Sequence, residues 1–306
     1  MENKKIVLSV AIAVKNEEKN ISSCLSSVKD VADEIVVVDG GSTDKTVEIA
    51  KSFGVKLIKT DNPPIFHINK QKALDACRGE WILQLDADEV VTKELKKEIV
   101  GVMGQKTMSR GRKYMTGYNE HGTEHGTGDN EQGAEIQDGR QNKLSDADCL
   151  MSNIYNGYYI PRKNYFWGHF MKKGGQYPDY VIRLVRRGKA RFPCKSVHEQ
   201  IVVEGDIGYL ENPLLHWSYR TLGDYWKKAE TYTTLSADEL KKNNMCPSLG
   251  MWASYVLVKP IRTFISLFVR HKGFYDGIYG FLFAFFSALH YPMTYRKFCI
   301  SYRCRL

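Results

Sequence analysis

An apolar segment that ends in three acidic residues stands at residues 79–89 and reads GEWILQLDADE. Residues 81–85 have the length and the nearly continuous hydrophobicity of a buried strand in a parallel sheet. Open α/β sheets bind ligands beyond the carboxyl ends of their strands, which is where Asp86 and Asp88 stand. The stretch therefore predicts an α/β fold with a polar site at the end of this strand.

Strands and helices alternate over the rest of the first hundred residues. Apolar residues recur at helical spacing between short apolar runs, as in a sheet whose strands are connected by helices. Buried strands are predicted at residues 7–14, 35–38 and 55–58.

Polar residues that favour helix starts follow two of these strands. Asn16 follows the first and is expected to cap the next helix. Asp39 ends the second, and a cluster at residues 42–44 is expected to cap the helix after it. Because parallel strands end at one edge, we expect Asp39, Asp86 and Asp88 to converge there.

The composition is that of an ordinary globular protein. The chain has 306 residues, of which 43% are hydrophobic and 26% charged, so a disordered chain and a fibre are excluded. Its seven cysteines include no C-x-x-C pair, which favours reduced cytoplasmic thiols over disulfides or a zinc site.

Four regions differ in their pattern. Residues 1–103 and residues 153–220 are expected to be the two halves of one α/β domain. Residues 104–152 contain few apolar side chains and are predicted to be a disordered insertion. Residues 221–306 are predicted to form an amphipathic helical extension.

The helical extension is basic and aromatic. Residues 241–306 contain ten Lys and Arg but one acid, Asp276, which leaves a net charge of +9. Basic and aromatic residues mixed in this way favour the inner face of the cytoplasmic membrane over nucleic acid. The uncharged run at 277–289 is too short to span a bilayer. The alternative is a helical pair that packs on the catalytic domain, and both can hold at once.

Two carboxylates at positions i and i+2 of a tight turn repel each other unless a cation lies beside them. Mg²⁺ or Mn²⁺ at Asp86 and Asp88 would balance both charges and bridge to a diphosphate. The alternative is that both residues cap the helix that starts near Thr92. His216 could complete metal or phosphate binding, or could instead be a core residue.

Three blocks in order resemble family 2 glycosyltransferases of the GT-A fold, which is a Rossmann-like open mixed sheet flanked by helices. They read SVAIAVKNEE at 9–18, VVVDGGSTDKT at 36–46, and the segment at 79–89. The blocks YPDYVIRLVRR at 177–187 and VHEQI at 197–201 are similar to the branch that contains lipopolysaccharide-core β-1,4-glucosyltransferases.

The resemblance implies that residues 1–103 are the nucleotide-sugar-binding half of a GT-A domain and that residues 153–220 are its acceptor-side half. It also implies roles for individual residues. Asp39 would contact the uracil of a UDP-sugar, Asp86 the ribose side, and Asp88 a metal on the diphosphate. Further residues assigned to the nucleotide are Asn16, Glu17, Ser42, Asp44 and Lys72. One departure is that Asn69 is followed by Lys70-Gln71-Lys72 instead of a small residue, which leaves the sugar contacts there open, although Lys70 or Lys72 could meet phosphate.

Inverting transfer also needs a base for the acceptor hydroxyl. The candidates are Glu199, which we favour, and Asp179. Neighbours on a strand point to opposite faces, so either His198 or Glu199 can face the site unless a bulge intervenes. The alternative for Glu199 is a salt bridge with Arg183 or Arg191, while Arg183, Arg186 and Arg187 could form a solvated strand face.

The expected function is therefore metal-dependent inverting transfer of a sugar from a nucleotide donor to a lipopolysaccharide-core or lipid-linked glycan. One variant uses polyprenyl phosphate as the acceptor. The alternatives are a nucleotidyltransferase of similar fold and a basic membrane- or nucleic-acid-binding protein without activity.

Overall fold

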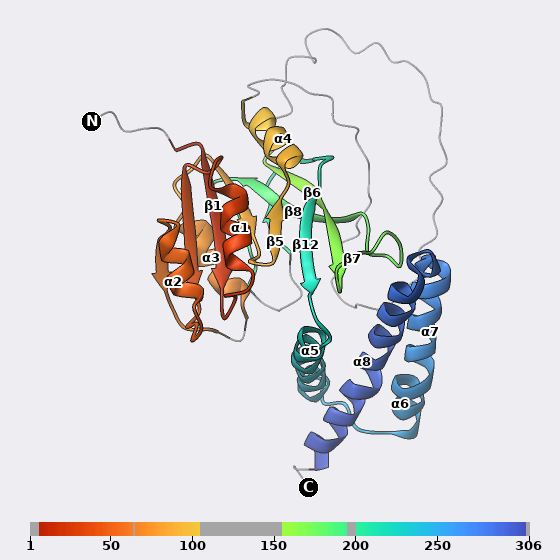
Figure 1. Cartoon of the computed structure of the whole chain (residues 1–306). Helices are drawn as coiled ribbons and strands as arrows, with labels where there is room; N and C mark the ends of the chain where they lie inside the picture. The colour runs from red at the N-terminus through yellow and green to blue at the C-terminus, as the bar shows by residue number, and fades with distance from the viewer. Residues whose placement is uncertain (1–5, 64, 105–154, 195–199, 304–306) are drawn as a thin grey trace, which may run out of the picture.

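The computed structural model describes residues 6–63, 65–104, 155–194 and 200–303, and shows one large sheet joined to a set of long helices (Figure 1). The sheet has the strand order β3-β2-β1-β4-β8-β6-β12-β5, with β11 and β7 paired to β6. A separate pair consists of β9 (Ala190–Arg191) and β10 (Val202–Val203).

The first part of the sheet is parallel. It consists of β1 (Leu8–Val14), β2 (Glu34–Asp39), β3 (Lys56–Lys59) and β4 (Trp81–Leu85), connected by α1 (Ile21–Val28), α2 (Thr46–Ser52) and α3 (His67–Asp75). Every residue of β4 is buried, because helices or other strands cover both faces of this strand. The four strands therefore end at the same edge of the sheet.

The second part of the sheet is mixed. Its strands are β5 (Glu89–Val91), β6 (Gly157–Phe166), β7 (His169–Phe170), β8 (Asp179–Arg186), β11 (Ile207–Tyr209) and β12 (Leu214–Tyr219). β8 runs antiparallel to both β4 and β6, and so joins the two parts. β12 lies parallel to β6 and antiparallel to β5. Helix α4 (Lys93–Gly104) follows β5 and buries Leu95 and Ile99 against the core.

The helical extension is made of two long antiparallel segments and α5 (Leu222–Lys242). The first segment covers residues 249–270: α6 (Leu249–Ala253), α7 (Lys259–Ile265) and two π-helical turns, Ser254–Val258 and Ser266–Arg270. The second is α8 (Gly277–Arg303). Phe166 and Met171 from the sheet region form a small core with Tyr225 and Ala229 of α5, against which α8 packs.

The expected fold class is confirmed: an open mixed sheet flanked by helices carries a C-terminal helical extension. The strand at 81–85 lies where the sequence predicts it, and α5 begins at Leu222, next to the predicted start of the helical extension at residue 221. The short strand β5 was not predicted, because three residues directly after a turn carry no periodic pattern. The predicted insertion lies almost entirely in residues 105–154, outside the described part of the chain.

Leu83 tests the importance of the central strand. It is fully buried in β4, so we expect Leu83→Ala to lower the free energy of unfolding by about 2–5 kcal/mol. Val100 on α4 is 51% exposed, and Val100→Ala should change it by less than about 0.5 kcal/mol. Urea unfolding of both variants measures the difference, and equal losses would contradict this assignment of the core.

Candidate functional site

The loops after β1 and β2 are tied together at the carboxyl edge of the sheet. Asn16 has a positive φ of 56°, and its Oδ1 accepts a hydrogen bond from the backbone N–H of Thr43 at 2.8 Å. The Asn16 N–H donates to Ser42 Oγ at 2.9 Å. The expectation that Asn16 caps α1 is therefore wrong, because its side chain is turned toward the neighbouring loop and Asn20 precedes the helix instead.

Asp39 and Asp44 hold this pair of loops in shape. Asp39 is buried at the end of β2 and accepts from the Ser42 N–H at 3.2 Å. Asp44 accepts from the N–H of Thr46, the first residue of α2, and from the N–H of Glu18. The carboxylates thus satisfy backbone donors that the sharp turns leave unpaired.

Asp86 stands between two cations at the end of β4. Its Oδ1 lies 2.5 Å from Lys70 Nζ, and its Oδ2 lies 2.6 Å from an Arg183 guanidinium nitrogen. Burial opposes the charge of Asp86, but Arg183 and then Lys70 more than offset it and hold the pKa of Asp86 well below its ordinary value. Asp86 is therefore ionised at neutral pH.

Arg183 also pairs with a second carboxylate. The same guanidinium nitrogen lies 2.7 Å from Oε1 of Glu89, a fully buried residue of β5, and another nitrogen donates to Gln84 of β4. The other Glu89 oxygen accepts from the backbone N–H of Asp86 at 3.0 Å. The side chain of one β8 residue thus joins the ends of β4 and β5.

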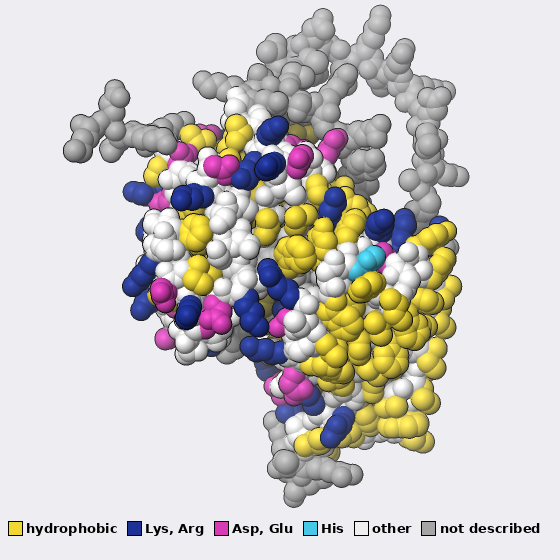
Figure 2. Space-filling model, in the orientation of Figure 1, with side chains coloured by type: hydrophobic (Ala, Val, Ile, Leu, Met, Phe, Trp, Pro, Cys, Tyr) yellow, Lys and Arg dark blue, Asp and Glu magenta, His cyan; other side chains and the backbone are white. Residues whose placement is uncertain are grey.

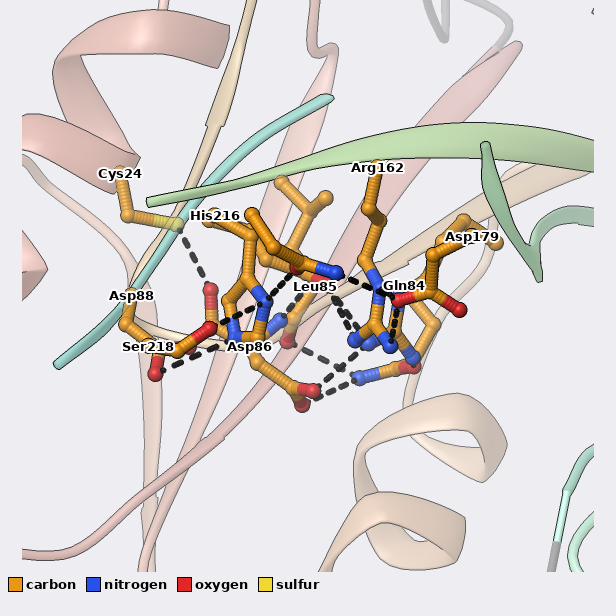
Figure 3. A network of polar contacts seen from close by, with 12 residues as sticks. Cys24, Gln84, Leu85, Asp86, Asp88, Arg162, Asp179, His216 and Ser218 are labelled. Atoms are coloured by element: carbon orange, nitrogen blue, oxygen red, sulfur yellow. Dashed lines mark hydrogen bonds and ion pairs between the residues drawn. The ribbon is translucent and has the colours of Figure 1, made fainter. Parts of the chain in front are cut away.

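The network continues across β6 to Asp179, as Figure 3 shows. Arg162 lies 3.5 Å from Glu89 and 2.6 Å from Asp179 Oδ2. Asn164 also donates to Asp179 Oδ2, at 3.0 Å, and its Oδ1 lies 2.6 Å from Nδ1 of His216.

Asn164 decides how His216 is oriented. Because the amide nitrogen of Asn164 donates to Asp179 and to the carbonyl of Gln176, its Oδ1 is left to accept from the Nδ1–H of His216. The Nε2 of His216 consequently faces Asp88, at 3.5 Å from Oδ2. Asp179 and Asp88 are thus linked through two intervening side chains.

Asp88 is the other carboxylate at the rim, and two basic groups approach it. Lys228 of α5 places Nζ 3.2 Å from Asp88 Oδ2 and also donates to the carbonyl of Ser218. Burial opposes the charge of Asp88, but His216 and Lys228 outweigh it and hold the pKa of Asp88 below its ordinary value.

Asp88 and His216 are suitable partners for a divalent ion. A carboxylate oxygen and an imidazole nitrogen face each other, and Mn²⁺ accepts both donor types. Within the described residues no group of three or more His, Cys, Asp and Glu side chains could hold a metal by itself, so a diphosphate or water would have to supply further ligands. Both oxygens of Asp86 are already paired with cations, which makes it a weaker candidate ligand than Asp88.

Glu17 lies near the same carboxylates. Burial raises the pKa of Glu17, and the charges of Asp88 and Asp86 raise it further, against the opposing effect of a hydrogen bond from Asn20. Because the charges of Asp86 and Asp88 act on Glu17, the loop after β1 lies in the same electrostatic environment as the acids after β4.

The structure brings most of the predicted site residues to one edge, with two qualifications. Lys72 bonds to Thr60 Oγ1 after β3, and it is Lys70 that reaches Asp86. Glu199, the favoured base, and His198 lie outside the described residues. The nucleotide contacts assigned to Asn16, Glu17, Asp39, Ser42, Asp44 and Asp86 stay predictions.

Several residues of the site were missed. Arg183 was considered part of a solvated strand face, which is wrong because its side chain is buried between Asp86 and Glu89. Glu89 was noted at the end of the strand segment but was given no role, and Lys228 was not considered. The adjacency of Glu89 to the D-x-D turn was a usable signal, whereas only the tertiary structure brings Lys228 there, 140 residues from Asp88.

Arg183 tests whether this network holds the sheet together. Arg183→Met should lower the free energy of unfolding by about 3–5 kcal/mol, because two carboxylates lose their buried partner. Arg186→Met, whose exposed partner is Glu80, should cost less than about 1 kcal/mol from the lost ion pair. Thermal and urea unfolding give the stability loss of each variant. An Arg183→Met protein as stable as the wild type would refute the role of Arg183 in holding the sheet together.

Proteins with sequence similarity to this chain include glycosyltransferases. Residues 9–152 match the family described as "Glycosyl transferase family 2". Over 104 residues the chain is 39% identical to an "Uncharacterized glycosyltransferase" of Rickettsia bellii. The aligned residues make up 34% of this chain and 35% of that protein, so the similarity spans about a third of each. It is 27% identical to the "Lipopolysaccharide core biosynthesis glycosyltransferase LpsC" of Rhizobium meliloti, over 96% of this chain and 92% of that one.

Solved structures with partial similarity include glucosyl-3-phosphoglycerate synthase from Mycobacterium tuberculosis. The match has 26% identity, covers 28% of this chain and 34% of that chain, and has a TM-score of 0.26. The chain described here thus matches the glycosyl transferase family 2 model over residues 9–152 and is similar, over nearly its whole length, to a lipopolysaccharide core biosynthesis glycosyltransferase.

Proposed function

We propose that this protein transfers a sugar from a nucleotide donor to a glycan acceptor, with inversion at the transferred carbon. The observation that carries the proposal is the pair of ionised carboxylates after β4, Asp86 and Asp88, each beside basic groups at the carboxyl edge of the sheet. This is the edge where open α/β sheets bind ligands. The family 2 match over residues 9–152 supports the same activity.

The donor is a nucleoside diphosphate sugar, and we favour UDP as its nucleotide. Asp39 and the loop after β1 would hold the base, and Asp86 the ribose. Lys70 of α3 and Lys228 of α5 both reach this edge, so their charges can offset those of a diphosphate. This arrangement supports a diphosphate donor better than a neutral sugar.

Asp88 and His216 are the residues that would hold Mg²⁺ or Mn²⁺. The bound ion would supply positive charge that stabilises the departing diphosphate. His216 is prepared for this role, since Asn164 holds its Nδ1–H and leaves Nε2 directed toward Asp88.

The transfer step requires a base on the acceptor side. The base takes the proton of an acceptor hydroxyl, whose oxygen forms a bond to the anomeric carbon as the bond to the diphosphate oxygen breaks. The products are an inverted glycoside and a nucleoside diphosphate. Asp179 and Glu199 are the two candidates. One oxygen of Asp179 is engaged by Arg162 and Asn164, which leaves only its other oxygen to approach an acceptor hydroxyl, so we favour Glu199.

The acceptor is a lipopolysaccharide-core or other lipid-carried glycan, and the protein works at the inner face of the cytoplasmic membrane. The R. meliloti relative, which is similar over nearly the whole chain, is named as a lipopolysaccharide core biosynthesis glycosyltransferase, and this supports the same acceptor class. The basic and aromatic helical extension supports a membrane location. A polyprenyl phosphate acceptor would fit the same arrangement.

Asp88 provides the direct test of donor use. Purified protein with Mn²⁺ and a panel of nucleotide sugars should release nucleoside diphosphate, and Asp88→Asn should reduce the rate about 100-fold or more. Mn²⁺ titration followed by electron paramagnetic resonance should show weaker binding in the same variant. Asp30→Asn, which alters an exposed ion pair with Lys96, is the matched control.

Two results would contradict this assignment. Unchanged activity and Mn²⁺ binding in Asp88→Asn would remove the role of Asp88. Formation of nucleotide sugar and pyrophosphate from a nucleoside triphosphate and a sugar phosphate, without nucleoside diphosphate release, would instead identify a nucleotidyltransferase.

The two candidate bases can be separated by conservative variants. We expect Glu199→Gln to reduce kcat by about 10²–10⁴-fold, because the amide cannot take a proton. Asp179→Asn should reduce it less and should alter unfolding, since Arg162 loses its partner. Steady-state kinetics with a membrane extract as acceptor source gives both values. The reverse order of the two kcat losses would make Asp179 the base.

A further inference from the structure

The helical extension leaves a broad apolar face uncovered. Among the described residues, 14 of the 21 large hydrophobic side chains that are exposed lie between Met245 and Ile300. In Figure 2 hydrophobic side chains form a continuous area over α6, α7 and α8, while basic and acidic side chains are interspersed over the rest of the visible surface. Contiguous apolar patches of this kind mark interaction surfaces.

The segment at 249–270 provides much of this face. Thr263 and Ser266 are buried, whereas Leu257, Ile261 and Ile265 recur every fourth residue on an exposed side. Ile261 is 58% exposed. Only 11% of the most apolar 18-residue window is buried, although the segment is long and apolar enough to cross a membrane.

A shallow groove of about 600 Å³ lies along the same side. It is lined by Leu257, Val258, Ile261, Arg262, Ile265, Ser266 and Arg270. Its lining therefore combines aliphatic side chains with two guanidinium groups, a combination suited to a ligand that is both apolar and anionic.

The turn between the two helical segments adds positive charge and aromatic rings. Arg270, His271 and Lys272 are exposed there, and Phe274 and Tyr275 follow them with exposed rings. The acid of this turn, Asp276, is buried and accepts hydrogen bonds from the backbone N–H groups of residues 172 and 173. Within the described part of 245–303, the surface therefore carries cations without an exposed carboxylate.

We propose that this face docks onto an anionic lipid bilayer and lies in its headgroup region. Apolar side chains would enter the acyl boundary, and the basic residues would meet lipid phosphates. The chain at 249–270 lies in the interface instead of spanning it, because Lys259 and Arg262 interrupt its centre and α8 packs along it. A second protein copy would match the apolar area but not the positive charge.

Docking would also set the distance between the membrane and the candidate site. Helix α5 connects the candidate site to α8: Lys228 reaches Asp88, while Tyr225 Oη lies 2.8 Å from His290 of α8 and Glu230 pairs with Lys297. A lipid-carried acceptor would then meet the sheet edge at a fixed height. This part of the inference rests on the proposed function and specifies how its acceptor is reached.

Vesicle binding tests the docking surface. The purified full-length chain should co-sediment with phosphatidylglycerol-containing vesicles and bind phosphatidylcholine vesicles about tenfold or more weakly. The double variant Ile261→Glu/Ile265→Glu should bind the anionic vesicles about tenfold or more weakly than the wild type. Val100→Glu on α4, an equally exposed apolar position, should bind like the wild type. Circular dichroism checks that each variant is folded.

Other outcomes would overturn the proposal. Equal vesicle binding by the double variant would exclude this face, and resistance of the bound wild type to carbonate extraction would indicate a spanning segment. A dimer in light scattering that the double variant abolishes, without vesicle binding, would make the face an interface between copies.

Donor turnover without vesicles separates the two proposals. The double variant should release nucleoside diphosphate at the wild-type rate, because neither residue lies at the sheet edge. If the wild type turns over a donor but does not bind vesicles, only the docking proposal is refuted. Vesicle binding without turnover of any donor would refute the proposed function alone.

Discussion

The buried pairing of Arg183 with Asp86 and Glu89 is the interaction on which the arrangement of this protein depends. Arg183 belongs to β8, the strand that joins the parallel and mixed parts of the sheet. Charged side chains removed from water are stable only when each has a partner. The network therefore requires the strand ends that carry these acids and bases to be placed together, and so it fixes the candidate site at the same time as the sheet.

This placement has an electrostatic consequence. Lys70, Arg183 and Lys228 keep Asp86 and Asp88 ionised despite their surroundings. The edge therefore contains ionised carboxylates with lysine partners before any ligand arrives, and a site prepared in this way loses little free energy to reorganisation on binding. Asn164 bonds to both His216 and Asp179, and so connects the charged groups around Asp88 to the candidate base Asp179.

Helix α5 connects this site to a surface of a different kind. Lys228 of α5 reaches Asp88, while Tyr225 of the same helix contacts α8, whose partner segment at 249–270 exposes aliphatic side chains. The two surfaces have different physical requirements, since one concentrates charge and the other leaves apolar area in water. A rigid helix between them makes the position of one depend on the other.

Local patterns in the sequence determined the parallel strands, their helices and the positions of Asp39, Asp86 and Asp88, because buried strands and turn residues are recognised within a few neighbours. They also determined the basic, aromatic character of the helical extension. The tertiary structure alone decided that Arg183 is buried, that Lys70 and not Lys72 reaches Asp86, and that Lys228 meets Asp88. Such pairings join residues far apart in the chain, and a charged side chain on a strand looks the same in sequence whether it faces solvent or a buried carboxylate.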